Sequence, residues 1–101
     1  MTSMEQFTKK IMKDATQNSF LFRRTYLAVM CWYSENKTDY FQMKQWIENK
    51  YSNDFKLEIN YVNHVLSSND RSELAISRHL AKKIKYEFQR IKNREIASLT
   101  I

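Results

Sequence analysis

Residues 26–33 read YLAVMCWY, eight consecutive apolar or aromatic residues that follow a pair of arginines. A helix that is apolar on all sides must be buried on all sides. The run is far short of the roughly 20 residues that a membrane-spanning helix needs. We therefore expect a central helix, beginning at Asn18 or Ser19 and ending near Ser34, that the rest of a soluble protein wraps.

The chain has 101 residues but no glycine and no proline. Average usage is about 7% glycine and 5% proline. Glycine allows the backbone to take positive φ angles and to approach phosphates, so phosphate-binding loops and dinucleotide fingerprints are excluded in their usual form. Tight hairpins are disfavoured for the same reason. The composition therefore predicts an all-α protein whose function lies on helix surfaces.

Further helices can be placed outward from the central one. Thr2 or Ser3, followed three residues later by Glu5 or Gln6, predicts a capping box for a helix over 3–15. Thr38 or Asp39 is expected to cap a third helix that ends near Tyr51. Asp70 and Glu73 are expected to cap a long last helix that reaches Ala97.

The segment 55–61 supports two interpretations. Phe55, Leu57, Ile59 and Tyr61 alternate with polar residues as in a strand, whereas Ile59, Val62, Val65 and Leu66 recur as in a helix. We expect a short extended piece followed by a helix. The complete chain, 1–101, is thus predicted to be a single domain, a compact bundle of four to five helices with at most one small β element.

The third helix, a short connection and the helix ending near residue 67 have the order of a helix-turn-helix unit. Ile47, Tyr51, Val62 and Leu66 resemble the core positions of winged-helix domains such as the globular domains of linker histones. The resemblance covers about 30 residues and includes no diagnostic motif. The usual turn glycine is missing, and the long last helix would stand in place of the wing.

Positive charge is concentrated near the C-terminus. The net charge is +6, and residues 76–101 contribute +5 of it through seven basic and two acidic side chains. A helix that is basic over most of its exposed surface can neutralise phosphates. The alternatives are a solvated helix face, an acidic protein partner and a membrane surface. The candidate phosphate-binding residues are Arg78, Lys82, Lys83, Lys85, Arg90, Lys92 and Arg94.

A second candidate surface lies on the helix around 59–67. Asn60, Asn63, His64 and Ser67 lie at helical spacing opposite its apolar side. Asparagine can bond bidentately to adenine in the major groove, and histidine can reach base edges or phosphates. The hypothesis is that Asn60, Asn63 and His64 read bases; the alternative is an ordinary polar face.

Catalytic and metal sites are not predicted. Cys31 is the only cysteine and lies in the most apolar run, which is typical of an inert core thiol. His64 and His79 have no cysteine or carboxylate at ligand spacing. We expect no enzymatic activity, no cofactor and no metal, and the lone thiol favours a reducing compartment, either cytoplasmic or nuclear.

The predicted function is therefore a small DNA-binding protein, a regulator of transcription, that binds DNA in preference to RNA. The alternative is a protein-binding module or inhibitor of the phage or viral type that docks on an acidic surface of a larger complex. A homodimer is a further hypothesis if the last helix pairs through its apolar stripe, which consists of Leu80, Ile84, Phe88 and Ile91.

Overall fold

The computed structural model describes residues 2–99 and consists of helices and short connections. Within those residues there is no strand, and the prediction of an all-α bundle of four to five helices is confirmed. The elements are α1 (Met4–Asp14), a 3-10 turn η1 (Ala15–Gln17), α2 (Ser19–Tyr33), α3 (Lys37–Tyr51), α4 (Lys56–Ser68) and α5 (Arg71–Leu99).

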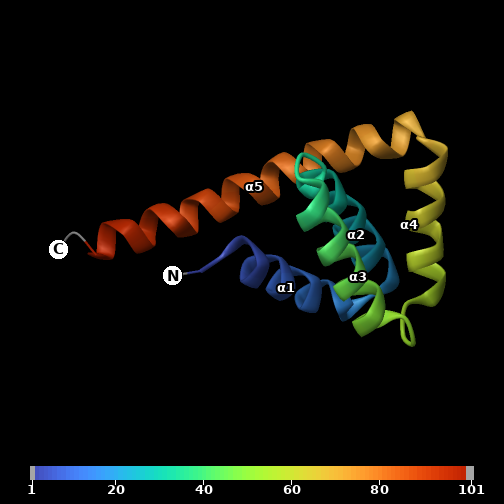
Figure 1. Ribbon diagram of the computed structural model, residues 1–101, viewed down its shortest axis with the longest axis horizontal. Coiled ribbons are helices and arrows are strands. Elements are labelled where there is room, and N and C mark those ends of the chain that lie inside the picture. The colour runs from blue at the N-terminus through green and yellow to red at the C-terminus, as the bar shows by residue number, and fades with distance from the viewer. Residues whose placement is uncertain (1, 100–101) are drawn as a thin grey trace.

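The central helix is α2, as its apolar sequence predicted. It contacts α1, α3, α4 and most extensively α5, and Figure 1 shows it enclosed by these helices. Residues 26–30 are at most 1% exposed. Tyr33, at the end of the run, is also buried, but Cys31 and Trp32 are half-buried, so the expectation that the whole run is wrapped is wrong for these two residues. These two residues lie where α2 emerges between α3 and α5.

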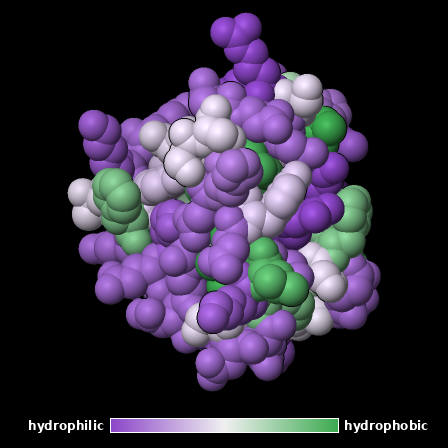
Figure 2. Space-filling view, turned by 90° about the vertical axis from the view of Figure 1, so that its right-hand side faces the viewer, coloured by the Kyte–Doolittle hydropathy of each residue, from purple (hydrophilic) through white to green (hydrophobic). Residues whose placement is uncertain are grey.

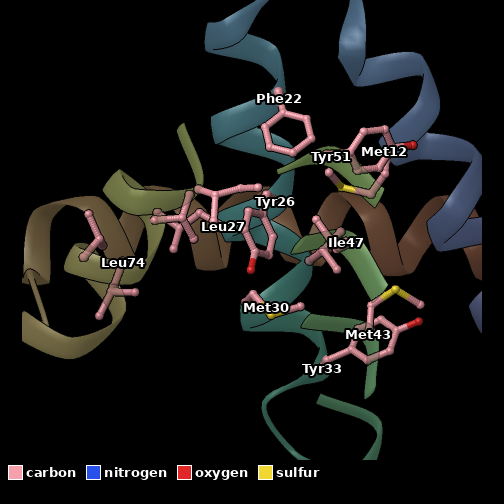
Figure 3. Close-up of a cluster of buried hydrophobic side chains, with 14 residues drawn as sticks. Met12, Phe22, Tyr26, Leu27, Met30, Tyr33, Met43, Ile47, Tyr51 and Leu74 are labelled. Carbon is pink, nitrogen blue, oxygen red and sulfur yellow. The ribbon is translucent and has the colours of Figure 1, made fainter. Parts of the chain in front are cut away.

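The buried core cluster draws side chains from all five α-helices, and its buried aromatic and methionine residues come from α1, α2 and α3 (Figure 3). The Phe22 ring is fully buried and stacks on Phe55 with the ring centroids 4.2 Å apart and the planes nearly parallel. It also meets Tyr51 edge-on at 5.4 Å. Such pairs contribute about 0.5–1.5 kcal/mol beyond the apolar area they bury.

Asparagine, aspartate and serine cap the helices in place of glycine. Ser3 and Gln6 form the predicted capping box, and Asn18 and Asp70 cap α2 and α5 as expected. The predicted cap of the third helix is wrong: Asn36 accepts from the Asp39 backbone N–H at 3.1 Å, so the helix begins at Lys37. Four nearby residues, Ser34, Asn36, Thr38 and Asp39, can all cap a helix, and only the backbone path selects one.

Residues 55–61 contain no extended piece, and the strand-like alternation there was misleading. Leu57, one of the alternating residues, is 78% exposed, whereas Ile59, Val62 and Val65 are buried at helical spacing. Packing against α2 therefore selects the 3.6-residue period over the two-residue period. Asn69 then ends α4 in the left-handed conformation, with φ 55°, that a glycine would usually take.

Three of the four positions that resemble winged-helix core residues are buried: Ile47, Tyr51 and Val62. Leu66 is half-buried and packs against the same core. Because residues 2–99 contain no strand, the described chain has no β wing, and α5 follows α4 directly.

Helix α5 crosses α2 and then continues past the bundle towards the C-terminus (Figure 1). Thr2 fastens this outer part, since its backbone N–H and its hydroxyl both donate to the Glu95 carboxylate. Of the apolar stripe considered for dimerisation, Phe88 is buried against Phe7 and Trp32, and the other three residues are half-buried. The stripe is thus partly covered by the chain itself.

None of the helices within residues 2–99 is long and apolar enough to cross a membrane.

The aromatic cluster around Phe22 provides a test of the core. We expect Phe22→Ala to lower the free energy of unfolding by about 3–5 kcal/mol, because it leaves a cavity among stacked rings. Phe20→Ala is the matched control, since Phe20 is 56% exposed and its loss should cost less than about 1 kcal/mol. Urea unfolding followed by tryptophan fluorescence measures both, and equal losses would contradict this description of the core.

Candidate nucleic-acid interface

The buried face of α5 decides where its charges point. Leu74, Ser77, Ala81 and Phe88 are buried, at spacings of three, four and seven residues along one side of the helix. Of the seven predicted basic residues, Lys83, Arg90 and Arg94 lie opposite this buried side, and the other four lie along its border or next to Phe88. Six of the seven are exposed, whereas Lys92 is half-buried with its ammonium 5.8 Å from the Phe88 ring centroid. The structure therefore places all but Lys92 at the surface.

These cations have few anionic partners. Among residues 2–99, the only ion pair made by the seven is Arg90 with Glu87, at 2.9 Å. Exposed pairs of this kind contribute about 0–1 kcal/mol and exchange readily. The α5 charges are thus not used to hold the fold together, and they remain available to an anionic ligand.

The structure divides the exposed cations into two sets. Arg78, Lys82 and Lys85, the groove cations, line a groove of about 570 Å³ beside α2 and α3. Lys83, Arg90 and Arg94, the outer cations, do not line this groove and project from the outward side of α5. Glu35 and Asp39 also line the groove, from the side of α2 and α3, whereas the acidic residue among the outer cations is Glu87, which pairs with Arg90.

One residue of this surface was missed by the sequence analysis. Tyr86 is 65% exposed, and helical spacing surrounds it with Lys82, Lys83 and Arg90. An exposed aromatic ring among cations is the arrangement on which nucleobases stack. The sequence does contain an indication of this role. Tyr86 lies outside the apolar stripe of α5, so its ring is expected to be exposed and not part of the core.

The polar face of α4 is only partly available. Asn60 and His64 are exposed, as a reading surface requires. Asn63 is half-buried, and its side-chain amide donates to Glu48 of α3 at 3.1 Å. Asn63 therefore links two helices, and its amide would have to leave Glu48 before it could contact a base.

Glu48 is the centre of this polar network. Besides Asn63, it accepts hydrogen bonds from the Tyr26 hydroxyl at 2.5 Å and from the Lys44 ammonium at 2.6 Å. Burial opposes ionisation of the carboxyl, but the hydrogen bonds from Lys44, Tyr26 and Asn63 outweigh it and lower the pKa of Glu48. The network ties α2, α3 and α4 together at one carboxylate.

The two predicted surfaces do not form one site. In Figure 1, α4 stands at one end of the molecule and the last part of α5 lies at the other, along a longest dimension of 48 Å. The face seen over the α4 end is mainly hydrophilic, with separated apolar patches (Figure 2). A ligand that touched both surfaces would have to extend along the molecule.

The described residues contain no cluster of three or more groups suited to bind a metal ion. Cys31 lies between two grooves rather than in the core. Burial raises the pKa of its thiol, although the charge of Arg78 acts in the opposite direction. A raised pKa lowers the thiolate fraction that a nucleophile needs.

No known protein family, curated protein or solved structure matches the chain. The proposal for its function therefore rests on the geometry of the helices and on the charges they expose.

The network at Glu48 yields a test of stability against pH. The pKa of Glu48 is lower in the folded state than in the unfolded chain, where a glutamate has a pKa of about 4.3. The ionised carboxylate therefore stabilises the fold at pH values above the unfolded pKa, and this stabilisation is lost as the pH falls through the folded pKa. We expect Glu48→Gln to lower the free energy of unfolding at pH 7 by about 1–3 kcal/mol, because its three donors lose a charged acceptor.

At pH 3 the wild-type carboxyl is increasingly protonated, so the difference between wild type and Glu48→Gln should shrink. Glu35→Gln is the control, since Glu35 is exposed and should contribute little at either pH. Urea unfolding at pH 3 and pH 7 measures these differences. A deficit of the same size at both pH values would argue against an ionised, hydrogen-bonded Glu48.

Proposed function

We propose that the protein binds nucleic acid, with duplex DNA as the expected form, through the outward side of α5. The observation that supports this most directly is the set of exposed cations on one rigid helix, of which only Arg90 has a carboxylate partner among the described residues. Such cations release the counterions condensed on nucleic acid when they approach its phosphates.

The outer cations suit this role best. Lys83 and Arg90 are two turns apart, or about 10 Å along the helix axis, and Arg94 continues the same side by one more turn. The acidic side chain among them, Glu87, pairs with Arg90, and within residues 2–99 neither Lys83 nor Arg94 makes an ion pair. Contacts of this kind fix the position of a protein on the backbone but carry no sequence information.

Recognition of particular bases would fall to α4. Asn60 and His64 are exposed there, and α3 and α4 follow each other as in a helix-turn-helix unit, joined by residues 52–55. An asparagine on such a helix can bond adenine in the major groove. A regulator of transcription would combine this readout at one end of the molecule with phosphate contacts along α5.

A salt titration tests the phosphate contacts. We expect the affinity for labelled random duplex DNA, measured by fluorescence anisotropy, to fall linearly with salt in a double-logarithmic plot. Lys83→Gln and Arg94→Gln should each reduce the slope by about 0.9, because each removes one phosphate contact.

Lys10→Gln is the control, because Lys10 is an exposed lysine on α1. It should leave the slope unchanged. Negligible binding by the wild type at low salt, or equal effects of all three substitutions, would rule out α5 as a nucleic-acid interface.

Tyr86 tests the form of nucleic acid that is bound. We expect Tyr86→Ala to weaken binding of a single strand by about tenfold, since stacking of one base contributes about 1–3 kcal/mol. Duplex affinity should change far less, because paired bases offer no open face to the ring. Tyr86→Phe keeps the ring and should bind like the wild type, and a loss with Tyr86→Phe as large as with Tyr86→Ala would contradict stacking.

A further inference from the structure

The groove beside α5 has an apolar floor. Trp32, Ala81 and Phe88 line it, from the C-terminal half of α2 and the middle of α5. Trp32 and Phe88 meet there with their ring centroids 5.6 Å apart. Trp32 is half-buried and supplies most of the open surface of this floor, because Ala81 and Phe88 are only 7% and 8% exposed.

The two walls of the groove carry opposite charges. One wall is α5, with Arg78, Lys82 and Lys85. The other holds Glu35, just after α2, and Asp39, in the first turn of α3. Within residues 2–99, no ion pair bridges the walls. Each row of charges is therefore available to a ligand lying between them.

This arrangement discriminates between ligand classes. A phosphate backbone that entered the groove would meet the carboxylates of Glu35 and Asp39 as well as the cations, so the groove is a poor site for nucleic acid. A ligand that is apolar in the middle and carries opposite charges on its two flanks would satisfy both walls and the floor. An amphipathic helix with one acidic and one basic flank has this form.

The length of the groove fits such a helix. Its wall on α5 extends from Arg78 to Gln89, or about 16 Å along the axis, which corresponds to three helical turns. Apolar side chains at positions i, i+3, i+4 and i+7 would fall along a floor of that length. A tryptophan with an arginine nearby is also typical of protein interfaces at which a few residues dominate affinity.

We propose that this groove binds a short amphipathic helix of a partner protein. The apolar stripe of that helix lies along the floor, chiefly on Trp32, its acidic flank meets the groove cations, and its basic flank meets Glu35 and Asp39. This site is separate from the outer cations, so the protein can hold nucleic acid and a protein partner at the same time.

Designed peptides test this proposal on the full chain. The probe is a fluorescein-labelled helical 14-residue peptide with leucine at i, i+3, i+4 and i+7, glutamate on one flank and lysine on the other. Two comparison peptides keep the leucines but carry glutamate or lysine on both flanks. We expect the mixed peptide to bind about tenfold more tightly than either, because only its two flanks can both form ion pairs with the groove walls.

Charge reversal in the groove provides the decisive comparison. Asp39→Lys should shift the preference to the peptide with two glutamate flanks, and Lys82→Glu should shift it to the peptide with two lysine flanks. Both positions are exposed, so the fold should tolerate the changes, as circular dichroism can verify.

Lys83→Glu is the matched control on the same helix, and it should weaken DNA binding without changing peptide preference. Best binding of the glutamate peptide by the wild type, equal binding of all three peptides, or no binding would each overturn the groove proposal. The DNA salt titration is independent of these results, so the two proposals fail separately.

Discussion

The structure depends on burying one helix on all sides. Helix α2 has a continuous apolar run, and residues 26–30 are excluded from water almost completely. No single neighbour can cover a helix of that kind, so α1, α3, α4 and α5 each pack against a different side. Apolar burial contributes about 25 cal/mol per Å², and α2 supplies five of the ten largest fully buried side chains among the described residues.

The burial of α2 also determines which residues of α5 are exposed. Because α5 covers more of α2 than any other helix does, one of its sides is committed to the core through Leu74, Ser77 and Ala81. Six of its seven predicted basic residues remain exposed, and among residues 2–99 only Arg90 of these makes an ion pair. The fold therefore produces a charged surface as a direct consequence of how it completes its core, and this links the packing of α2 to the proposed binding of phosphates.

The hydrogen-bond network at Glu48 has a different role from the charged surface of α5. Glu48 gathers Tyr26, Lys44 and Asn63, and a carboxylate that accepts several hydrogen bonds fixes the relative positions of the helices that supply them. Glu48 is half-buried, and a hydrogen bond to a charged acceptor of this kind contributes about 1.5–3 kcal/mol. Asn63 is thus better explained by the assembly of α2, α3 and α4 than by recognition of a ligand.

The sequence by itself determined the helical class, most helix ends and the basic character of the last helix, because these depend on spacing, capping residues and composition within one segment. Only the tertiary structure decided that 56–61 is helical, that Asn63 faces Glu48, and that the α5 cations divide between a groove and an outer side. Each of these depends on which side chains from distant segments meet. The periodicity of one segment does not predict contacts between side chains of different helices, because these contacts depend on how the helices pack around α2.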